Sequence, residues 1–530
     1  FLGGRDATWL AIGASIFASN IGSEHLIGLA GAGASSGMAM AHWEIQGWMI
    51  LILGWVFVPF YSRSMVYTMP EFLERRYNPQ SRTILSVISL VSYVLTKVAV
   101  TVYAGGLVFQ QVFGIKELWG IDFFWIAAIG LVVLTALYTI FGGMKSVLYT
   151  SVLQTPILLL GSLIILVLGF KELGGWDEMM RVCGAVTVND YGDTMTNLIR
   201  SNDDANFPWL GALIGSAIIG FWYWCTDQFI VQRVLSGKNE KEARRGTIFG
   251  AYLKLLPVFL FLIPGMIAFA LHQKYIGAGG EGFLPMLANG TANADAAFPT
   301  LVAKLLPAGV KGLVVCGILA ALMSSLASLF NSSAMLFTID FYKRFRPETP
   351  EKKLVGIGQI ATVVIVILGI LWIPIMRSVG DVLYTYLQDV QSVLAPGIAA
   401  AFLLGICWKR TSAQGGMWGL IAGMIIGLTR LGAKVYYSNA GEVADSTFKY
   451  LFYDMNWLFF CGWMFLFCII VVIVVSLATE APTAEKIQGL VFGTATKEQK
   501  AATRASWDHW DIIHTVIILA ITGAFYWYFW

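Results

Sequence analysis

The chain has 530 residues, of which 57% are hydrophobic and only 13% are charged. A soluble domain carries about 25% charged residues, so this composition excludes a soluble protein and indicates a multi-pass membrane protein. The formal net charge of +3 is too small to indicate a nucleic-acid partner.

Apolar runs that are long enough to cross a bilayer, which takes roughly 20 residues, recur about thirteen times along the chain. Strands of a membrane β-barrel are short and alternate in polarity, so these long runs predict an all-α integral membrane protein. The expected spans are 8–34, 37–61, 82–113, 121–141, 146–170, 208–234, 246–272, 308–342, 354–376, 380–408, 415–433, 450–478 and 509–530.

Basic residues gather in connections that all fall on one side of this alternating topology. The positive-inside rule makes that side cytoplasmic. The opposite side receives the two long loops, at about 171–207 and 273–307. The basic residues are Arg63, Arg75, Arg76, Arg82, Lys238, Lys241, Arg244, Arg245, Lys343, Arg344, Arg346, Lys352, Lys353, Lys409, Arg410, Lys497, Lys500 and Arg504.

The centre of the first span is polar, although it should lie at mid-membrane. Hydrocarbon cannot satisfy polar side chains or irregular backbone, which are tolerated at this depth only where they line a cavity. A break of this kind predicts a discontinuous helix, the usual sign of a transporter's binding site. The polar residues are Ser19, Asn20, Gly22, Ser23, Glu24 and His25.

Four ionisable side chains lie inside the expected spans, where they are costly and usually functional. Glu44 in span two and Lys254 in span seven are expected to bind a ligand. Lys97 in span three is expected to be a structural ion-pair partner, and Asp227 in span six either binds or only orients a broken helix. The neighbouring aromatic residues Trp43, Tyr223 and Trp224 form either ordinary packing or a stacking platform and gate.

Spans six and ten carry further polar interruptions. Span six reads Trp222-Tyr-Trp-Cys-Thr-Asp-Gln228, and span ten combines Tyr384, Gln388 and Gln391 with Pro396. Proline removes a backbone donor and kinks or breaks a helix. Because spans one and six are five apart, their polar centres would face each other in an inverted repeat of five plus five helices.

Span eight contains adjacent hydroxyl residues among small neighbours, at Ser324, Ser325 and Ser328. Small and hydroxyl residues commonly pack membrane helices together. The same hydroxyls, with carbonyls released by an unwound first span, would also supply the oxygen ligands that an alkali cation needs. Both interpretations stay open from this pattern alone.

Several of these segments together resemble the solute:sodium symporter family, and most closely its sodium/glucose cotransporter branch, in the form of a bacterial sodium/sugar symporter. The resemblance extends over essentially the whole chain. It is carried by Phe17–His25, Thr68–Leu73, Trp222–Gln228, Val231–Arg233, Ser324–Leu326, Phe337–Asp340 and Gly405–Arg410.

The resemblance implies a LeuT-type fold, with inverted repeats at 8–170 and 208–408, additional C-terminal helices at 411–530, and a family segment expected before Phe1. It also implies sodium-driven uptake by alternating access. The implied sodium ligands are the carbonyls of Ala18, Ile21 and Ala321 with the hydroxyls of Ser324 and Ser325. The implied sugar contacts are Asn20, His25, Glu44, Trp224, Lys254 and Gln388, with Tyr223 as inner gate and Leu29, Trp43 and Tyr384 closing the outer side.

Three positions depart from the family pattern. Gly220 stands where sugar transporters usually carry a polar side chain, so one hydroxyl contact is expected to be lost or replaced by water. The family pattern has an acid at the position of Ser151. Members coupled to two sodium ions carry a hydroxyl residue at the position of Ala327. We therefore expect one sodium ion per sugar.

The sequence thus predicts sodium-coupled symport of a glucose- or galactose-like monosaccharide in the plasma (inner) membrane. A polyol needs the acceptors, donors and aromatic face that these side chains offer. The alternatives are an inositol, carboxylate or amino-acid symporter, and a sugar sensor or leak channel on the same fold. The expected partners are the sugar, Na+ and the bilayer. No hydrolytic, redox or Cys/His metal pattern is visible, so neither an enzyme nor an obligatory protein partner is expected.

Overall fold

The computed structural model describes residues 5–22, 24–287, 290–379, 383–439 and 444–530, without the side chains of 138, 140–155 and 375–379. Within these residues the chain is predominantly helical, which confirms the all-α prediction. Strands β1 (Glu117–Leu118) and β2 (Ile121–Asp122) form a short antiparallel pair in one loop. Ser23, and the side chain of Ser151, lie outside the described residues.

Helices of the first part of the chain surround the polar break of the first span. In chain order they are α1 (Trp9–Asn20), α2 (Ala30–Ser36), α3 (Ala41–Glu44), α4 (Gly47–Ile52), α5 (Val58–Ser64), α6 (Met69–Arg76), α7 (Pro79–Ser92), α8 (Ala99–Phe113), α9 (Phe123–Leu173) and α10 (Trp176–Gly184). Shorter wound segments connect several of them: η1 (Glu24–Leu29), η2 (Gly37–Met40), η3 (Leu53–Phe57) and η4 (Tyr93–Val98).

The second part of the chain begins after the long loop that follows α10. Its helices are α11 (Trp209–Gly220), α12 (Gln228–Leu235), α13 (Glu240–Lys254), α14 (Ile263–Gly277), α15 (Ala297–Leu305), α16 (Ala308–Met335), α17 (Lys343–Phe345), α18 (Glu351–Val379), α19 (Leu383–Cys407) and α20 (Ala413–Asn439). The intervening segments are η5 (Phe221–Thr226), η6 (Val258–Leu262), η7 (Ala294–Ala296) and η8 (Leu336–Tyr342).

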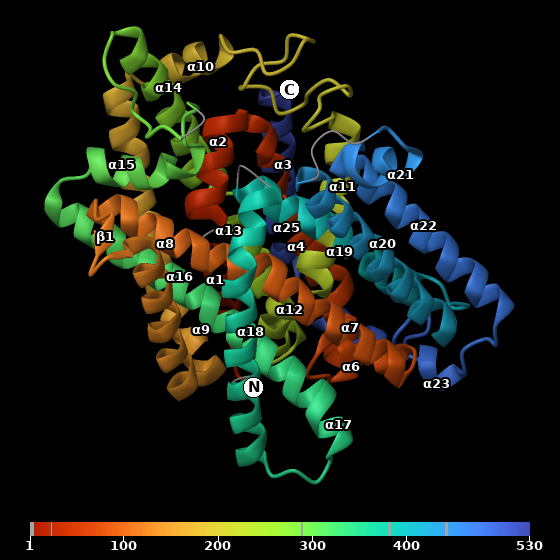
Figure 1. Ribbon diagram of the computed structural model, residues 1–530. Helices are drawn as coiled ribbons and strands as arrows, with labels where there is room; N and C mark the ends of the chain where they lie inside the picture. Colours follow the sequence, from red (N-terminus) through yellow and green to blue (C-terminus); the bar gives the residue numbers. More distant parts are fainter. Residues whose placement is uncertain (1–4, 23, 288–289, 380–382, 440–443) are drawn as a thin grey trace.

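The C-terminal helices are α21 (Thr447–Lys449), α22 (Trp457–Ala478), α23 (Ala484–Ile487), α24 (Lys497–Ala505) and α25 (His509–Tyr528), with η9 (Tyr450–Asp454) after α21. Helix α19 packs against both α20 and α22, while α16 runs along α9 on the other side of the bundle. Figure 1 shows α20 and α22 together at the right-hand edge, with α19 between them and the central helices.

Many helix starts are fixed locally by capping side chains. Thr68 accepts a hydrogen bond from the Glu71 amide, and Asn239 does the same for Glu242. Such side chains satisfy amide groups that the first turn leaves without a helical partner. These capping residues therefore fix the residue at which each of these helices begins.

The expected count of thirteen spans is not confirmed. Among the described residues, eleven helices are long and apolar enough to cross a membrane. Helix α1 has only 12 residues, because the polar break ends it at Asn20. Helix α9 runs for 51 residues through both 121–141 and 146–170, where the sequence predicts a loop at 142–145. Gly142 and Gly143 lie there, and glycine lowers helix propensity by only about 1 kcal/mol per residue, which does not force a helix to end.

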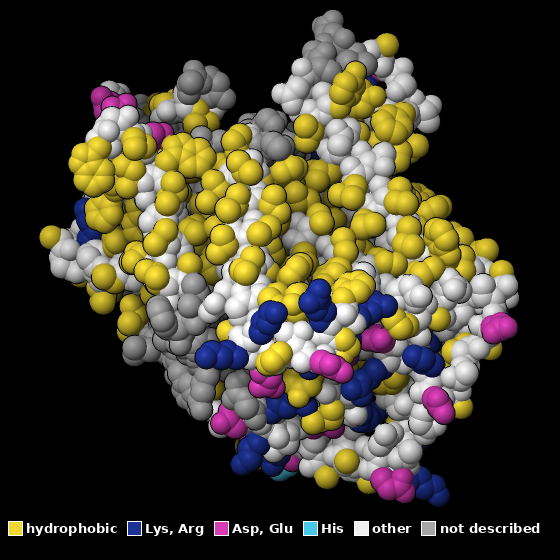
Figure 2. Space-filling model, turned by 60° about the horizontal axis from the view of Figure 1, so that its bottom comes forward, with side chains coloured by type: hydrophobic (Ala, Val, Ile, Leu, Met, Phe, Trp, Pro, Cys, Tyr) yellow, Lys and Arg dark blue, Asp and Glu magenta, His cyan; other side chains and the backbone are white. Residues whose placement is uncertain are grey.

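The outer surface matches a membrane environment. Figure 2 shows a broad band of hydrophobic side chains, with Lys, Arg, Asp and Glu gathered at one end of this face. Large apolar side chains stay exposed along α18, α22 and α25, for example Leu371, Trp463 and Val516. Exposed apolar surface of this extent marks a membrane or protein contact, and the spans identify it as the lipid-facing surface.

Candidate functional site

The first helix is interrupted where its sequence is polar, as predicted. Helix α1 ends at Asn20, and Ile21 adopts an extended conformation (φ −78°, ψ 92°). The Gly22 amide donates to the Asn20 carbonyl at 3.0 Å instead of continuing the helical ladder to Ala18. The Gly22 carbonyl then accepts from His25 and Leu26, and the chain rewinds as η1. The break therefore releases backbone oxygens at the centre of the protein.

A second interruption follows α11. The chain passes through η5 into Asp227, which is extended (φ −75°, ψ 129°) and caps α12 through the Phe229 amide. The Asp227 carboxylate also accepts a 2.7 Å hydrogen bond from the Tyr93 hydroxyl. These contacts favour the interpretation in which Asp227 orients the broken helix.

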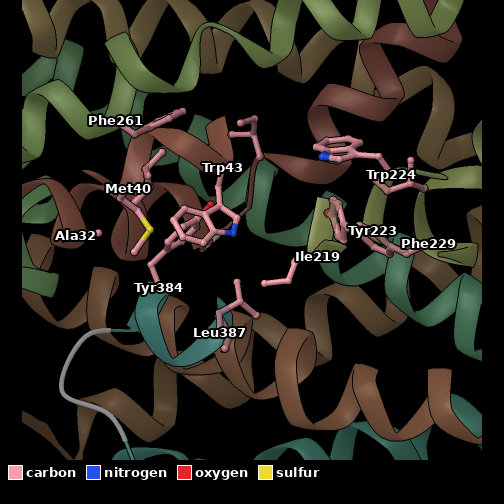
Figure 3. Close-up of a cluster of buried hydrophobic side chains, with 14 of the residues drawn as sticks. Ala32, Met40, Trp43, Ile219, Tyr223, Trp224, Phe229, Phe261, Tyr384 and Leu387 are labelled. Atoms are coloured by element: carbon pink, nitrogen blue, oxygen red, sulfur yellow. The ribbon is translucent and has the colours of Figure 1, made fainter. Parts of the chain in front are cut away.

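A small buried cavity lies between the two interruptions. Every side chain that lines it is at most 8% exposed, so the cavity lies in the interior of the protein. Figure 3 shows Trp43, Tyr384, Leu387, Ile219, Tyr223 and Trp224 around this region. The lining residues are Asn20, Glu24, His25, Trp43, Gln46, Lys97, Ile219, Gly220, Tyr223, Trp224, Lys254, Tyr384, Leu387, Gln388 and Gln391.

Glu44 of α3 joins side chains from three other elements, α13, η1 and α19. Its Oε2 accepts a 2.6 Å hydrogen bond from Lys254 Nζ and lies 3.2 Å from His25 Nε2. Its Oε1 accepts a 2.6 Å hydrogen bond from the Tyr384 hydroxyl. Asn20 Nδ2 lies 3.3 Å from the same His25 nitrogen. The structure thus brings together five residues that the sequence analysis assigned to the substrate site or its outer gate.

Other polar atoms at the cavity have no hydrogen-bond partner among the described residues. They are the side-chain amide oxygen of Gln388 (Oε1), the indole nitrogen of Trp43 and Nδ1 of His25. Unpaired buried polar atoms cost about 1–3 kcal/mol each. An acceptor and a donor held in this way are suited to bind hydroxyl groups of a neutral ligand. Lys254 Nζ lies 5.3 Å from the centre of the Trp224 ring, which contributes the aromatic wall.

The expected gate residues are all buried. Tyr223, Trp43 and Tyr384 line this cavity, whereas Leu29 is not among its lining residues. Tyr223 on η5 packs edge-on against Trp224 with ring centres 4.9 Å apart. The Tyr223 hydroxyl accepts a 3.2 Å hydrogen bond from Lys97, which also lies over the Phe229 ring. Lys97 was expected to be a structural ion-pair partner. It contacts a hydroxyl and aromatic rings, and the negative charges of Glu24 and Asp227 act on it electrostatically. On the outer side, Trp43 stacks on Trp457 with ring centres 5.5 Å apart, and Leu29 is fully buried.

The residues expected to bind sodium lie where the first break meets α16. A side-chain carbon added to Gly22 would lie only 2.8 Å from Ser325 Oγ, so the unwound backbone approaches this hydroxyl closely. Ser19 Oγ lies 3.2 Å from Ser328 Oγ across the same interface. Ala18, Ala321 and Ser324 are buried beside it. The carbon added to Gly22 would also lie 2.7 Å from Glu24 Oε2, so a carboxylate oxygen also lies at this interface. Carbonyl, hydroxyl and carboxylate oxygens are the ligands that a hard cation prefers.

Several cavity residues were missed by the sequence analysis. Glu24 and Gln391 were noted as polar positions but were given no role in the site, and Gln46, Ile219 and Leu387 were not singled out. Gln46 had a detectable signal, since it lies two residues after Glu44 in an otherwise apolar span. Ile219 and Leu387 look like ordinary core residues in the sequence.

Asp295 ties the loop segment η7 to the start of α19. Its carboxylate accepts a hydrogen bond from the Leu383 amide, at the start of α19. A side-chain carbon on Gly31 of α2 would lie 2.5 Å from Asp295 Oδ1, so the loop sits directly on α2. Burial raises the pKa of Asp295 from 3.8 to about 7. The ionisable side chains on the elements packed against η7 are Glu24, His25, Tyr103 and Lys304.

This burial predicts a pH-dependent stability. In the folded protein Asp295 binds a proton below about pH 7, whereas in the unfolded protein it does so only near its ordinary pKa of 3.8. The free energy of unfolding therefore increases as the pH falls from 7 towards 4. We expect the melting temperature to rise between pH 8 and pH 5.5 in the wild type. Asp295→Asn, which keeps an acceptor for Leu383, should flatten this rise and be the more stable protein at pH 8. The exposed-acid control Asp203→Asn should leave the profile unchanged, and an unchanged profile in Asp295→Asn would contradict the assignment.

Comparison with known proteins agrees with a transporter that has a central binding cavity. The profile of the Sodium:solute symporter family matches residues 1–423. The human sodium/myo-inositol cotransporter 2 is 37% identical over 507 residues, covering 93% of this chain and 74% of that protein. The sheep sodium/glucose cotransporter 1 is 39% identical over 498 residues, covering 91% of this chain and 74% of that protein.

Solved structures with low sequence identity share the fold. The substrate-bound, outward-open Na+-coupled sialic acid symporter superposes with a TM-score of 0.69 at 22% identity, covering 91% of this chain and 92% of that one. The transporter MhsT, in complex with L-phenylalanine, gives a TM-score of 0.51 at 12% identity, covering 89% and 99%. These neighbours have the LeuT-type fold, which confirms the fold prediction. The chain therefore belongs to the sodium:solute symporter family and is a multi-pass, sodium-coupled solute transporter.

Proposed function

We propose that this symporter carries a glucose- or galactose-like monosaccharide into the cell with sodium by alternating access. The observation that carries the proposal is the Glu44 cluster in a buried cavity. Both carboxylate oxygens already accept short hydrogen bonds, from Lys254 and Tyr384, so the charge is balanced by the protein. Hydroxyls of a neutral polyol can share these bonds without bringing a charge of their own.

Inositol is the second candidate, because both substrates are six-membered rings rich in hydroxyls. The cotransporters of 36–38% identity include several whose names specify myo-inositol, and the sheep protein of 39% identity is named for glucose. A sugar differs from inositol at its ring oxygen, which accepts hydrogen bonds but cannot donate one. Selectivity therefore depends on whether the cavity faces that atom with donors or with acceptors.

In this proposal the side chains of the cavity have distinct roles. The sugar contacts are Asn20, His25, Glu44, Trp224, Lys254 and Gln388, with Tyr223 as inner gate and Leu29, Trp43 and Tyr384 as outer gate. Sodium is held by the carbonyls of Ala18, Ile21 and Ala321 and by the hydroxyls of Ser324 and Ser325. The moving units are the repeats 8–170 and 208–408, with 411–530 outside them, in a plasma or inner membrane with the basic connections on the cytoplasmic side.

Uptake into proteoliposomes tests the substrate. Labelled glucose, galactose and myo-inositol should be offered separately under an inward sodium gradient, with a potassium gradient as control. Accumulation of at least one hexose above its external concentration, only with sodium, supports the proposal. Accumulation of inositol alone would establish the second candidate. Saturable binding without accumulation would identify a sensor, and failure of all three ligands to bind would overturn the polyol assignment.

The coupling ratio should be one sodium ion per sugar. Ala327 offers no oxygen and is fully buried on α16. A second ion would therefore lack the hydroxyl at position 327 and the acid at position 151 that relatives coupled to two sodium ions carry. The measurement is the reversal potential, or a dual-isotope flux ratio, in proteoliposomes. Since a second sodium would square the chemical part of the concentration ratio, a ratio near two would be readily detected and would refute this expectation.

A further inference from the structure

Gln46 occupies the space beside a glycine in the cavity wall. Gln46 lies in the turn between α3 and α4, two residues after Glu44, and is 2% exposed. A side-chain carbon built on Gly220 would lie 2.4 Å from Gln46 Oε1 and 3.0 Å from its amide carbon. The glutamine amide therefore fills the volume that any side chain at position 220 would need.

The orientation of this amide is fixed by a backbone group. Gln46 Nε2 donates a 2.7 Å hydrogen bond to the Ser216 carbonyl. A carbonyl can only accept, so the nitrogen must point to α11 and the oxygen must be the atom beside Gly220. Gln46 and Gly220 both line the cavity, and the side chain therefore presents an acceptor at this wall.

We propose that Gln46 is a further specificity-determining residue, whose Oε1 accepts a hydrogen bond from one hydroxyl of the bound polyol. This inference rests on the proposed function of the cavity. Gly220, which has no side chain to offer a polar contact, makes room for Gln46, and the contact is made from α3–α4 instead of from α11. Glu44 and Gln46 then present two acceptors from a single turn.

An acceptor at this position selects for a substrate donor. A hydroxyl satisfies Gln46 Oε1, whereas a ring ether oxygen or a deoxy carbon leaves it unpaired in a dry site. Sites built to hydrogen-bond a substrate hydroxyl discriminate strongly against analogues that lack it. The sugar must therefore place a hydroxyl, and not its ring oxygen, at this wall, while inositol can satisfy the contact in every orientation.

The test compares wild type and Gln46→Ala across a panel of monodeoxy-glucoses and glucose itself in sodium-driven uptake. Gln46→Ala should raise the half-saturating glucose concentration about tenfold or more. One monodeoxy analogue should bind the variant at least as well as the wild type, because it already lacks the hydroxyl that Gln46 contacts. Gln46→Met, which keeps the volume without the acceptor, should reproduce this pattern and serves if the alanine variant fails to assemble.

A residue exchange provides an independent measurement. Gly220→Ser alone should be poorly tolerated, because its side chain would collide with the Gln46 amide. Gln46→Ala combined with Gly220→Ser should recover glucose affinity relative to Gln46→Ala, since a hydroxyl returns to the same space. The control Gln414→Ala replaces an exposed glutamine on α20 and should change neither affinity nor selectivity.

The outcomes separate this inference from the proposed function. If Gln46→Ala weakens every analogue by the same factor, Gln46 only braces α11 and the inference is overturned. Unchanged affinity in both Gln46 variants overturns it as well, although wild-type transport of hexose would still support the proposed function. If wild type transports neither hexose nor inositol, the proposed function itself fails, whatever the Gln46 variants do.

Discussion

Ser325→Ala should abolish sodium-driven accumulation of sugar while leaving the protein folded. In the proposed site this hydroxyl is one of two side-chain ligands, and the other ligands are backbone carbonyls that no substitution removes. A dehydrated cation that loses one of so few oxygens has no water to replace it in a buried site, where polar atoms are costly to leave unpaired. The measurement is concentrative uptake into proteoliposomes, together with the sodium dependence of the melting temperature.

A matched control lies on the same helix. Ser333 is fully buried on α16, and its hydroxyl has no hydrogen-bond partner among the described residues. Ser333→Ala should therefore leave uptake and its sodium dependence unchanged and should not lower stability. If Ser325→Ala still concentrates sugar with the sodium dependence of wild type, this hydroxyl is not a sodium ligand. Loss of sodium dependence in both variants would indicate a general packing defect of α16.

The helical class and the broken first helix could be predicted from local sequence, because both follow from how hydrocarbon treats polar groups. Six polar or glycine residues within one apolar run have no other stable placement than a cavity. The number of spans was predicted less accurately than these two features. Residues 142–145 permit a loop but do not require one, and helix α9 continues through them. Hydropathy also cannot show that α1 is only half a span.

Some residues of the candidate site could also be predicted from the sequence, whereas others could not. Buried charges such as Glu44 and Lys254 stand out in the sequence because they are rare in spans, and the structure pairs them directly. Contacts that depend on how helices rotate against each other leave no such signal. Gln46 meets Gly220 across α4 and α11, and Asp295 reaches Leu383 from a loop 88 residues away. Only the packed structure shows that Gln46 and Gly220 line one cavity and that Asp295 contacts the start of α19.

Glu44→Ala and Gln388→Ala should each weaken sugar affinity about tenfold or more, but for different reasons. Gln388 Oε1 has no hydrogen-bond partner among the described residues. Gln388→Ala therefore removes a substrate contact, together with a side-chain hydrogen bond to Tyr384, whose hydroxyl keeps its bond to Glu44. Its effect should be confined to affinity, at roughly 1–3 kcal/mol for a lost hydrogen bond. Uptake kinetics against sugar concentration would measure it, with the melting temperature unchanged.

Glu44→Ala removes the acceptor of Lys254 and Tyr384 and leaves a buried ammonium group without its carboxylate. Breaking a buried ion pair in this way costs about 3–5 kcal/mol, so this variant should also melt at a clearly lower temperature than Gln388→Ala. The double variant Glu44→Ala/Lys254→Ala removes the uncompensated charge as well. It should recover much of the stability without recovering affinity, because the ligand contacts stay absent. Unchanged apparent affinity in both single variants would exclude this cavity as the sugar site. Recovery of affinity in the double variant would instead show that Glu44 acts on the substrate only by neutralising Lys254.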